Sequence, residues 1–364
     1  MILTPANIAH YLLGRGVITH ESVVDGDFWV IEKSLRNRNF IVMRNHSPGL
    51  FLKQIKSWDQ QAIITLGYEA TCYQLSQTDE DFQALVPLMP KYYAFDPERH
   101  ILIVELLKDG ENLADYHLRL GKFPTDVAAQ VGKLLGRFHH DIRDRIKDSA
   151  KASLFQKRMP WILQLHQLNS NFLEPISAGN AEVINIVKSF PEFHEILNAI
   201  QSQYEFNCLI HGDIKWENCV LYKNGDGEPK IKIVDWELAD IGDACWDAGA
   251  IFQSYITCWI MSIPITAGVA PSQLLDQAKY PIDDMQPAIK AFWQAYTEAL
   301  EADGKTQREL LKRSVRYGAA RMIQTVYEHM SPSPQITPNA VCLLQVSLNI
   351  LQNPAEAITD LLGM

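Results

Sequence analysis

The chain has 364 residues, a length that suits either two domains or one large domain with two lobes. Its composition, 47% hydrophobic and 21% charged, is that of an ordinary globular protein and argues against a disordered or low-complexity chain. The formal net charge of −10 disfavours non-specific binding to a polyanion, so we predict no nucleic-acid partner. The six cysteines show no CxxC spacing, as expected for reduced thiols in a cytoplasmic protein.

Two segments bear on targeting and membranes. The N-terminal residues lack the basic start and long apolar run of a signal peptide, and Thr4 followed by Pro5 predicts a helix N-cap with proline at the first helical position. Residues 248–275 contain no charged side chain and are long enough to consider as a membrane span. Prolines and a glycine interrupt this stretch, so we expect a buried helix followed by an apolar loop, and no membrane partner.

The first third of the chain has the pattern of β-strands. Residues 28–34, 39–44 and 50–55 are short runs rich in β-branched and aromatic side chains, separated by turn-forming residues. They predict an antiparallel meander. A helical segment over residues 59–76 and a strand pair ending in residues 101–107 follow.

The pattern changes after residue 107. Residues 124–142 place apolar side chains on one helical stripe, so we expect the first lobe to cover residues 1–107 and the second lobe residues 108–364. The remainder of the second lobe is mostly helical, with predicted helices over residues 288–302, 307–330 and 339–352.

The segments HGDIKWEN (residues 211–218) and IVDWE (residues 233–237) carry the chemistry. Asn-Gly and Asp-Gly in the turn between them predict a β-hairpin, whose second strand ends at Asp235. Asp235 should therefore lie beside Asn218. A carboxylate and an amide oxygen are hard ligands suited to Mg²⁺. Asp213, on the same loop, would face the metal-bound phosphate from the substrate side, as phosphoryl transfer requires.

These two segments resemble the aminoglycoside phosphotransferase and choline kinase family, whose members share the bilobal fold of protein kinases. The resemblance implies an α+β fold, with an antiparallel sheet plus helix in the N-lobe and a mostly helical C-lobe that carries a catalytic β-hairpin. It also implies ATP and Mg²⁺ as cofactors. Asp213 would be the catalytic base, Asn218 and Asp235 the metal ligands, and Lys53 the strand lysine that pairs with nucleotide phosphates.

Two features depart from the family pattern. Lys215 stands two residues after Asp213, as in eukaryotic-type protein kinases, and we assign it a catalytic role in offsetting the negative charge of the transferring phosphoryl group. The loop over residues 34–39 contains no glycine. Arg36 and Arg38 could cover the nucleotide phosphates instead, with a solvated hairpin turn as the alternative.

The roles of two glutamates follow from the same resemblance. Glu69, in the first predicted helix, is expected to orient Lys53 through an ion pair, with Asp79 and Glu80 as alternatives. Glu237 either assists the metal or bonds a neighbouring backbone amide, and we assign it to the metal.

Four further residues are expected near the site. Glu105 and Leu107, at the end of the last strand of the N-lobe, are assigned to nucleotide binding. His211 is expected to shape the catalytic loop by hydrogen bonding. Asp247 resembles the aspartate that braces this loop in the family, a supporting role.

We therefore expect a phosphotransferase that uses ATP and Mg²⁺ to phosphorylate a hydroxyl of a small molecule, such as an amino sugar, an amino alcohol or a related metabolite. Lys215 makes a kinase acting on Ser or Thr of a small peptide a plausible alternative. A catalytically silent kinase fold that only binds nucleotide is a third reading. The presence of Lys53, Asp213, Asn218 and Asp235 argues against silence.

The acceptor is less well defined. Tryptophans and tyrosines of the C-lobe, Tyr255 and Trp259 among them, could form an aromatic cage for a cationic amine, but their helical spacing favours a place in the core. Acidic residues within 237–247 could attract an amino sugar, although most of them already have a role at the metal or the loop.

Overall fold

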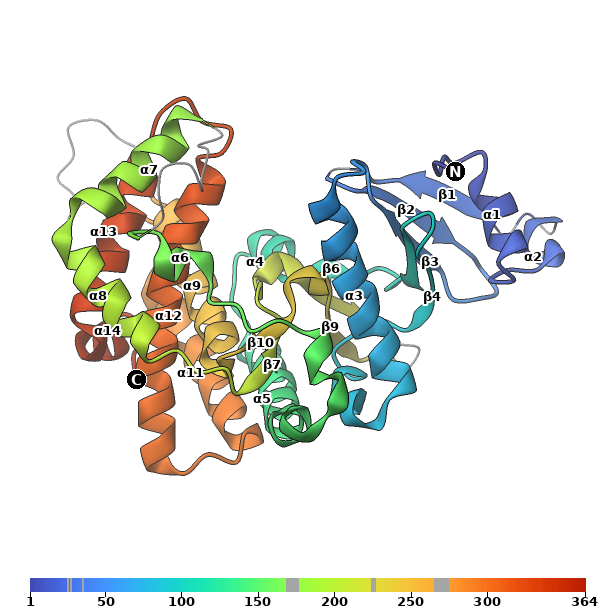
Figure 1. Cartoon of the computed structure of the whole chain (residues 1–364). Coiled ribbons are helices and arrows are strands. Elements are labelled where there is room, and N and C mark those ends of the chain that lie inside the picture. The colour runs from blue at the N-terminus through green and yellow to red at the C-terminus, as the bar shows by residue number, and fades with distance from the viewer. Residues whose placement is uncertain (25, 27, 35, 168–176, 224–226, 265–274) are drawn as a thin grey trace. The chain divides into compact units, whose positions relative to one another are not determined.

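We describe a computed structural model of the chain, which places all residues except 25, 27, 35, 168–176, 224–226 and 265–274. The described chain forms two compact units. The first contains residues 1–113 and 217–239, and the second contains residues 114–216 and 240–364. Figure 1 shows a sheet in the first unit and mainly helices in the second, which confirms the predicted α+β class.

A five-stranded antiparallel sheet forms the body of the first unit. Its strand order is β1-β2-β3-β5-β4, so the first three strands form the predicted meander. The strands are β1 (Trp29–Glu32), β2 (Arg38–Met43), β3 (Leu50–Gln54), β5 (Ile101–Glu105) and β4 (Tyr92–Asp96).

One long helix, α3 (Gln60–Thr78), connects β3 to the rest of the first unit. It begins where predicted because the side chain of Asp59 accepts a hydrogen bond of 2.8 Å from the backbone N–H of Ala62, which caps the helix. A short 3₁₀ helix, η1 (Glu80–Leu85), follows it, and Asp79 caps this second helix by accepting from the N–H of Asp81.

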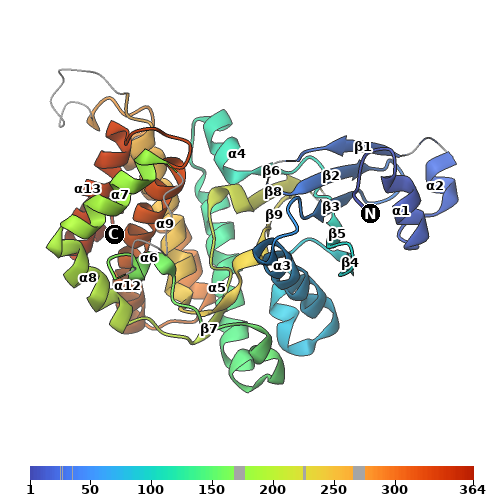
Figure 2. The same cartoon turned by 45° about the horizontal axis from the view of Figure 1, so that its top comes forward.

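The two faces of the sheet have different functions. Side chains of successive strand residues point to opposite faces, so alternate residues share a face. One face packs against the N-terminal helix α1 (Ile8–Gly14), which lies beside the sheet in Figure 2. Phe40 of β2, Leu52 of β3 and Ile103 of β5 are fully buried in that core. The other face carries Lys53 and lines a cavity.

The predicted start of the N-terminal helix was wrong. The helix α1 begins at Ile8 with Asn7 as its N-cap residue. The side chain of Asn7 accepts a hydrogen bond of 2.8 Å from the N–H of Thr4, so the preceding residues form a turn in place of the first helical turn. A short helix, α2 (His20–Val24), follows.

The predicted catalytic hairpin consists of β8 (Cys219–Lys223) and β9 (Pro229–Ile233). Its turn residues 224–226 lie outside the described part of the chain. A two-residue strand, β6 (Glu111–Asn112), pairs with β8, and the short 3₁₀ helices η3 (Trp216–Asn218) and η4 (Trp236–Leu238) flank the hairpin.

The hairpin groups with the first unit, whereas our division placed it in the C-lobe. The N–H of Ile233 donates a 2.6 Å hydrogen bond to the carbonyl of Leu88, which joins β9 to the first unit. The lobe boundary after residue 107 itself stays a prediction.

Helices make up most of the second unit. The predicted helices 307–330 and 339–352 match α12 (Gly304–His329) and α13 (Pro338–Gln352) closely. The predicted helix 288–302 corresponds to α11 (Ile282–Ala299), which begins earlier and contains Pro287. The strands β7 (Cys208–Ile210) and β10 (Asp240–Gly242) pair antiparallel within this unit. The helices are α4 (Leu113–Leu120), α5 (Thr125–Asp148), η2 (Ala150–Leu154), α6 (Trp161–Gln164), α7 (Ala178–Ser189), α8 (Pro191–Ser202), α9 (Ala244–Met261), α11 (Ile282–Ala299), α12 (Gly304–His329), α13 (Pro338–Gln352) and α14 (Pro354–Asp360).

The first half of the uncharged stretch over residues 248–275 lies in one helix. This part belongs to α9, most of whose residues are buried, and residues 265–274 lie outside the described chain. Among the helices that the structure describes, none combines the length and apolar character needed to cross a membrane.

Candidate active site

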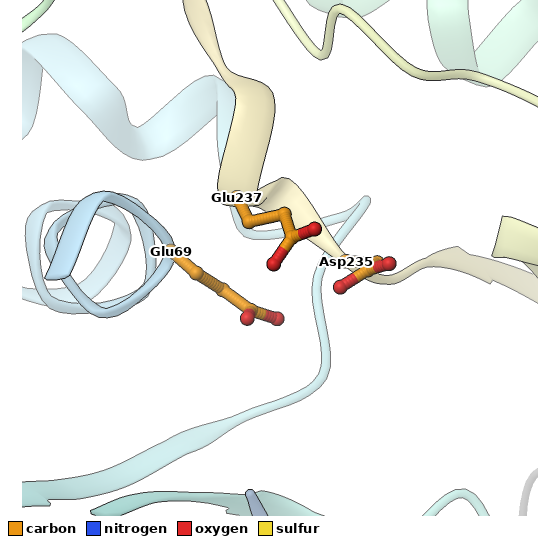
Figure 3. Close-up of side chains that lie close together, drawn as sticks. All are labelled: Glu69, Asp235 and Glu237. Carbon is orange, nitrogen blue, oxygen red and sulfur yellow. The ribbon is translucent and has the colours of Figure 1, made fainter. Parts of the chain in front are cut away.

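Lys53 lies at the centre of a carboxylate cluster in the first unit. Its Nζ is 2.7 Å from Oε2 of Glu69 on α3, 2.5 Å from Oδ1 of Asp235 and 3.8 Å from Oε2 of Glu237. Figure 3 shows the three carboxylates pointing toward one another, Glu69 from its helix and the other two from the segment after β9. The predicted Lys53–Glu69 ion pair is therefore present. The alternative Asp79 instead caps η1.

Burial and the neighbouring charges together set the pKa values of the groups in this cluster. Burial opposes the charged form of Lys53, but Glu69, Asp235 and Glu237 outweigh this effect and hold the pKa of its ammonium above the ordinary value. Burial also raises the pKa of Glu69 to about 7, even though Lys53 acts in the opposite direction. Three carboxyl groups thus surround one ammonium, so the cluster can attract a further cation.

Of the two arginines that we assigned to phosphate binding, only Arg36 reaches the cluster. Its Nη1 lies 2.7 Å from Oε1 of Glu237, while its side chain is 69% exposed. Arg38 lies in β2 opposite Gln54 and is not among the residues that line the neighbouring cavity. Glu237 is held by this arginine and lies near Lys53; its predicted role at the metal stays a prediction.

The backbone at Asp235 explains how its carboxylate reaches Lys53. This residue lies two positions after the end of β9 and has a left-handed conformation (φ 69°, ψ 53°), which few residues other than glycine, asparagine and aspartate adopt readily. The resulting turn starts η4.

The hairpin brings Asn218 and Asp235 to neighbouring positions, as predicted. The N–H of Val234 donates a 2.9 Å hydrogen bond to the carbonyl of Asn218. The carboxyl groups of Glu69, Asp235 and Glu237 each place one oxygen within 4.8 Å of the others. Glu69, Asp235 and Glu237 thus form a group of carboxylates that could hold a metal ion, and Asn218 lines the same cavity.

The cavity beside this cluster measures about 540 Å³ and belongs wholly to the first unit. Its volume lies within the range of small-molecule and cofactor sites. Charged and amide groups line one part of it, and apolar side chains of the sheet and hairpin line the rest. Glu105 and Leu107 are both in the lining, together with Ile41, Phe51, Tyr73, Leu102, Val104, Leu106, Val220 and Val234.

The second unit holds Asp213 between two cations. Its Oδ2 is 2.8 Å from Nζ of Lys215, and its Oδ1 is 3.2 Å from Nη2 of Arg321. Burial favours the neutral acid, but Arg321 and then Lys215 outweigh it and lower the pKa of Asp213. Asp213 is consequently a carboxylate at neutral pH.

Two buried residues hold the loop around Asp213. Nδ1 of His211 accepts a 3.2 Å hydrogen bond from the N–H of Asp213, so His211 shapes the loop as predicted. Asp247 of α9 accepts from the N–H groups of His211 (2.7 Å) and Gly212 (3.0 Å), which confirms the predicted brace. Burial opposes the charge on Asp247, but a hydrogen bond with His139 and the loop amides outweigh it and lower its pKa.

Arg321 was not identified from the sequence. It lies in α12, more than a hundred residues after Asp213, and the helix pattern alone gives no sign that this arginine turns inward. Only 4% of its surface is exposed, which is unusual for an arginine.

The tryptophans and tyrosines that were considered for an aromatic cage in the second unit lie in its core. Trp246, Tyr255, Trp293 and Tyr296 are each at most 6% exposed, in agreement with the reading that their helical spacing favoured. Trp259 is 8% exposed.

The acidic residues of the second unit near the loop pair with cations of the protein. Asp240 lies 2.5 Å from Nε of Arg158, and Asp243 lies 2.9 Å from Nη1 of Arg313. Both carboxylates therefore contribute to the structure of their own unit, and neither supports the idea of an acidic patch for an amino sugar.

The comparisons with known proteins concern the fold. No protein-family model matches the chain, and no curated protein is similar to it. A choline/ethanolamine kinase family protein from Mesorhizobium loti has a similar structure, with a TM-score of 0.52 and 15% identity over 97% of this chain and 96% of that one. The GDP complex of aminoglycoside 2'-phosphotransferase-IIIa matches with a TM-score of 0.51 and 13% identity over 95% and 99% of the two chains. The chain therefore has the fold of the protein-kinase-like phosphotransferases, as the sequence resemblance implied.

Proposed function

We propose that this protein is a phosphotransferase that uses ATP and Mg²⁺ to phosphorylate a hydroxyl group of a small molecule. The observation that carries this proposal is the buried Lys53–Glu69 ion pair, which faces Asp235 beside a cavity large enough for a nucleotide. A lysine fixed in this way can bind phosphate oxygens as a point charge.

The side chains of the first unit fit a magnesium ion chemically. Asp235, Glu237 and Asn218 offer carboxylate and amide oxygens, the ligands that Mg²⁺ prefers, and all three line the cavity. We assign the ion to these residues. When bound, it would neutralise charge on the phosphates of the nucleotide.

Asp213 would act as the base. It is ionised, and it can accept the proton of the acceptor hydroxyl while the hydroxyl oxygen forms a bond to the γ-phosphorus. The bond from this phosphorus to the bridging oxygen breaks, and ADP leaves with that oxygen. Lys215, now paired with Asp213, can offset the charge of the transferring group.

The acceptor that we propose is an amino sugar, an amino alcohol or a related metabolite. The names of the two similar structures, a choline/ethanolamine kinase family protein and an aminoglycoside phosphotransferase, favour this class. Lys215 keeps a Ser or Thr peptide as a second candidate, because this lysine follows the aspartate as it does in protein kinases.

The test begins with thermal shift. We expect Mg-ATP to stabilise the protein, and we expect ATP turnover in the presence of a pool of amino alcohols and amino sugars. Stabilisation without turnover in any pool would favour a silent nucleotide-binding module, and turnover with Ser/Thr peptides alone would replace the proposed acceptor class. Mg-GTP run in parallel identifies the preferred nucleotide.

Two variants then separate the roles of the aspartates. Asp213→Asn should lower kcat about 10²–10⁴-fold and leave Mg-ATP binding intact, because it removes only the proton acceptor. Asp235→Asn should weaken Mg-ATP binding itself. Asp283→Asn, at an exposed position in the first turn of α11, is the matched control. Full activity in both site variants would refute the assignment.

A further inference from the structure

Arg321 contacts three consecutive residues of the catalytic loop. Its Nη1 donates a 3.0 Å hydrogen bond to the carbonyl of Gly212, and its Nη2 lies 3.1 Å from the carbonyl of Ile214 and 3.2 Å from Oδ1 of Asp213. One guanidinium therefore bonds the aspartate and both residues beside it. Only a planar group with several donors can make these contacts together.

A tryptophan supports the guanidinium from α9. The Cζ of Arg321 lies 5.2 Å from the ring centroid of Trp246, a cation–π distance. The indole N–H of Trp246 donates a 3.0 Å hydrogen bond to the same Gly212 carbonyl that Arg321 bonds. Gly212 has a φ of 81°, a conformation that favours glycine. Its carbonyl is held by one donor from α9 and one from α12.

Close packing of two helices brings Arg321 to the loop. A Cβ at Gly318 of α12 would lie 2.6 Å from the carbonyl oxygen of Gly249 on α9, and a Cβ at Gly249 would lie 2.3 Å from the carbonyl oxygen of Ser314. Glycine at both positions thus allows the backbones to approach. Arg321 follows Gly318 by one helical turn, and Asp247 precedes Gly249 by two residues.

We propose that Arg321 is a positioning residue, which clamps residues 212–214 from α12 and orients the carboxylate of Asp213 for proton transfer. The claim that Arg321 aids proton transfer rests on the proposed function. Asp247 holds the N–H groups at the start of the loop, whereas Arg321 holds the carbonyl groups and the carboxylate that follow. The two helices that pack closely at Gly249 and Gly318 thus hold the loop together: α9 bonds its N–H groups through Asp247, and α12 bonds its carbonyl groups through Arg321.

The clamp makes distinct predictions for two substitutions. In Arg321→Lys, a single ammonium keeps the charge beside Asp213 but cannot reach all three acceptors, so we expect kcat to fall at least tenfold with little change in the KM for Mg-ATP. In Arg321→Met, the acid limb of the pH–rate profile should also move to higher pH. That shift follows because Lys215 and His211, which also lower the pKa of Asp213, then act without the guanidinium.

Hydrogen exchange of the full-length protein gives a readout that does not depend on activity. We expect the amides of residues 211–214 to exchange at least ten times faster in both Arg321 variants. Arg313→Gln is the control, because Arg313 is a partly buried arginine of the same helix and pairs with Asp243. It should lower Tm without moving the acid limb or the exchange of this loop.

The outcomes separate the inference from the proposed function. Exchange and turnover of Mg-ATP within twofold of wild type in Arg321→Lys would overturn the clamp, and so would losses in Arg321 variants that match those of Arg313→Gln. If Arg321→Met does not fold, Arg321→Lys decides. Faster loop exchange in a protein whose wild type transfers no phosphoryl group to any acceptor would support the clamp and reject the kinase function.

Discussion

Each unit contains one cluster of charged residues, and the two clusters have opposite charge arrangements. In the first unit, the ammonium of Lys53 lies among three carboxyl groups, with Arg36 at the rim as the second cation. In the second unit, the carboxylate of Asp213 lies between the cations of Lys215 and Arg321. Negative groups are in excess around Lys53, and positive groups are in excess around Asp213.

This difference matches two different chemical tasks. An excess of carboxylates can accept a divalent cation and still hold a lysine in its charged form. An excess of cations around one carboxylate keeps it ionised and available to accept a proton, and it also suits the negative charge of a transferring phosphoryl group. The contrast can be tested by changing one charge at a time.

Removing the ammonium of Lys53 should have the largest effect on stability and turnover. Lys53→Met leaves the carboxyl groups of Glu69 and Asp235 without their common partner, so we expect about 3 kcal/mol of lost stability, since breaking a buried ion pair is costly. Turnover of Mg-ATP should fall about 10²–10³-fold. Denaturant unfolding and steady-state kinetics measure the two effects.

Two further variants serve as comparisons for Lys53→Met. Lys53→Arg keeps the charge but changes its shape, so it should retain more stability than Lys53→Met and still lose activity. Lys133→Met, at an exposed position on α5, controls for the loss of a lysine elsewhere. A Lys53→Met protein with wild-type nucleotide affinity would contradict the assignment of the first unit.

The arrangement around Asp213 depends on helix packing, which a methyl group can disturb. Gly318→Ala would place a Cβ 2.6 Å from the carbonyl oxygen of Gly249, so we expect a loss of roughly 1–3 kcal/mol from overpacking. Because Arg321 lies one turn further along α12, turnover should fall as well. Gly304→Ala, at the first residue of the same helix, meets only the end of the Arg308 side chain at 4.0 Å and should change neither quantity. Equal behaviour of the two alanine variants would show that the helix contact does not position Arg321.

The sequence predicted the first unit better than the second. The strands around Lys53 and the hairpin that ends at Asp235 follow from local alternation and turn residues, so the neighbours of Asp235 could be placed in advance. Predicting Glu69 as the ion-pair partner of Lys53 required the position of only one helix. Arg321, in contrast, reaches Asp213 through a crossing of two helices far apart in the chain, and no local pattern encodes such a crossing.

Arg38 shows a second limit of local reasoning. It is only two residues from Arg36 and has the same charge, but it occupies a register position in β2 opposite Gln54. The arginine that reaches Glu237 is thus selected by where the strand begins, a boundary that sequence patterns locate poorly.

Lowering the pH should change the stability contributions of the two charge clusters in opposite ways in metal-free protein. The pKa of Glu69 is raised to about 7 from 4.5, so the folded state takes up a proton before the unfolded state does, and stability should rise as the pH falls from 7 toward 4.5. The pKa values of Asp213 and Asp247 are lowered, so their contribution is present above about 3.8 and is lost only as the pH falls through their depressed folded values.

The measurement is Tm between pH 7.5 and pH 5 in the presence of EDTA. Glu69→Gln should remove the part of the pH dependence that comes from Glu69, whereas Asp283→Asn, an exposed substitution on α11, should leave it unchanged. An identical pH dependence in wild type and Glu69→Gln would contradict the raised pKa of Glu69.

The smallest effect is expected at the rim of the first unit. The side chain of Arg36 is 69% exposed, so its ion pair with Glu237 is largely screened by solvent and Arg36→Gln should change stability by less than about 1 kcal/mol. If Arg36 also contacts nucleotide phosphates, as we predicted, the Kd for Mg-ATP should rise several-fold, and the difference from wild type should shrink at high salt. Arg38→Gln is the matched control two residues away, and it should leave Kd unchanged because Arg38 is not in the cavity lining. A larger loss of affinity in Arg38→Gln than in Arg36→Gln would show that the other arginine binds the phosphates.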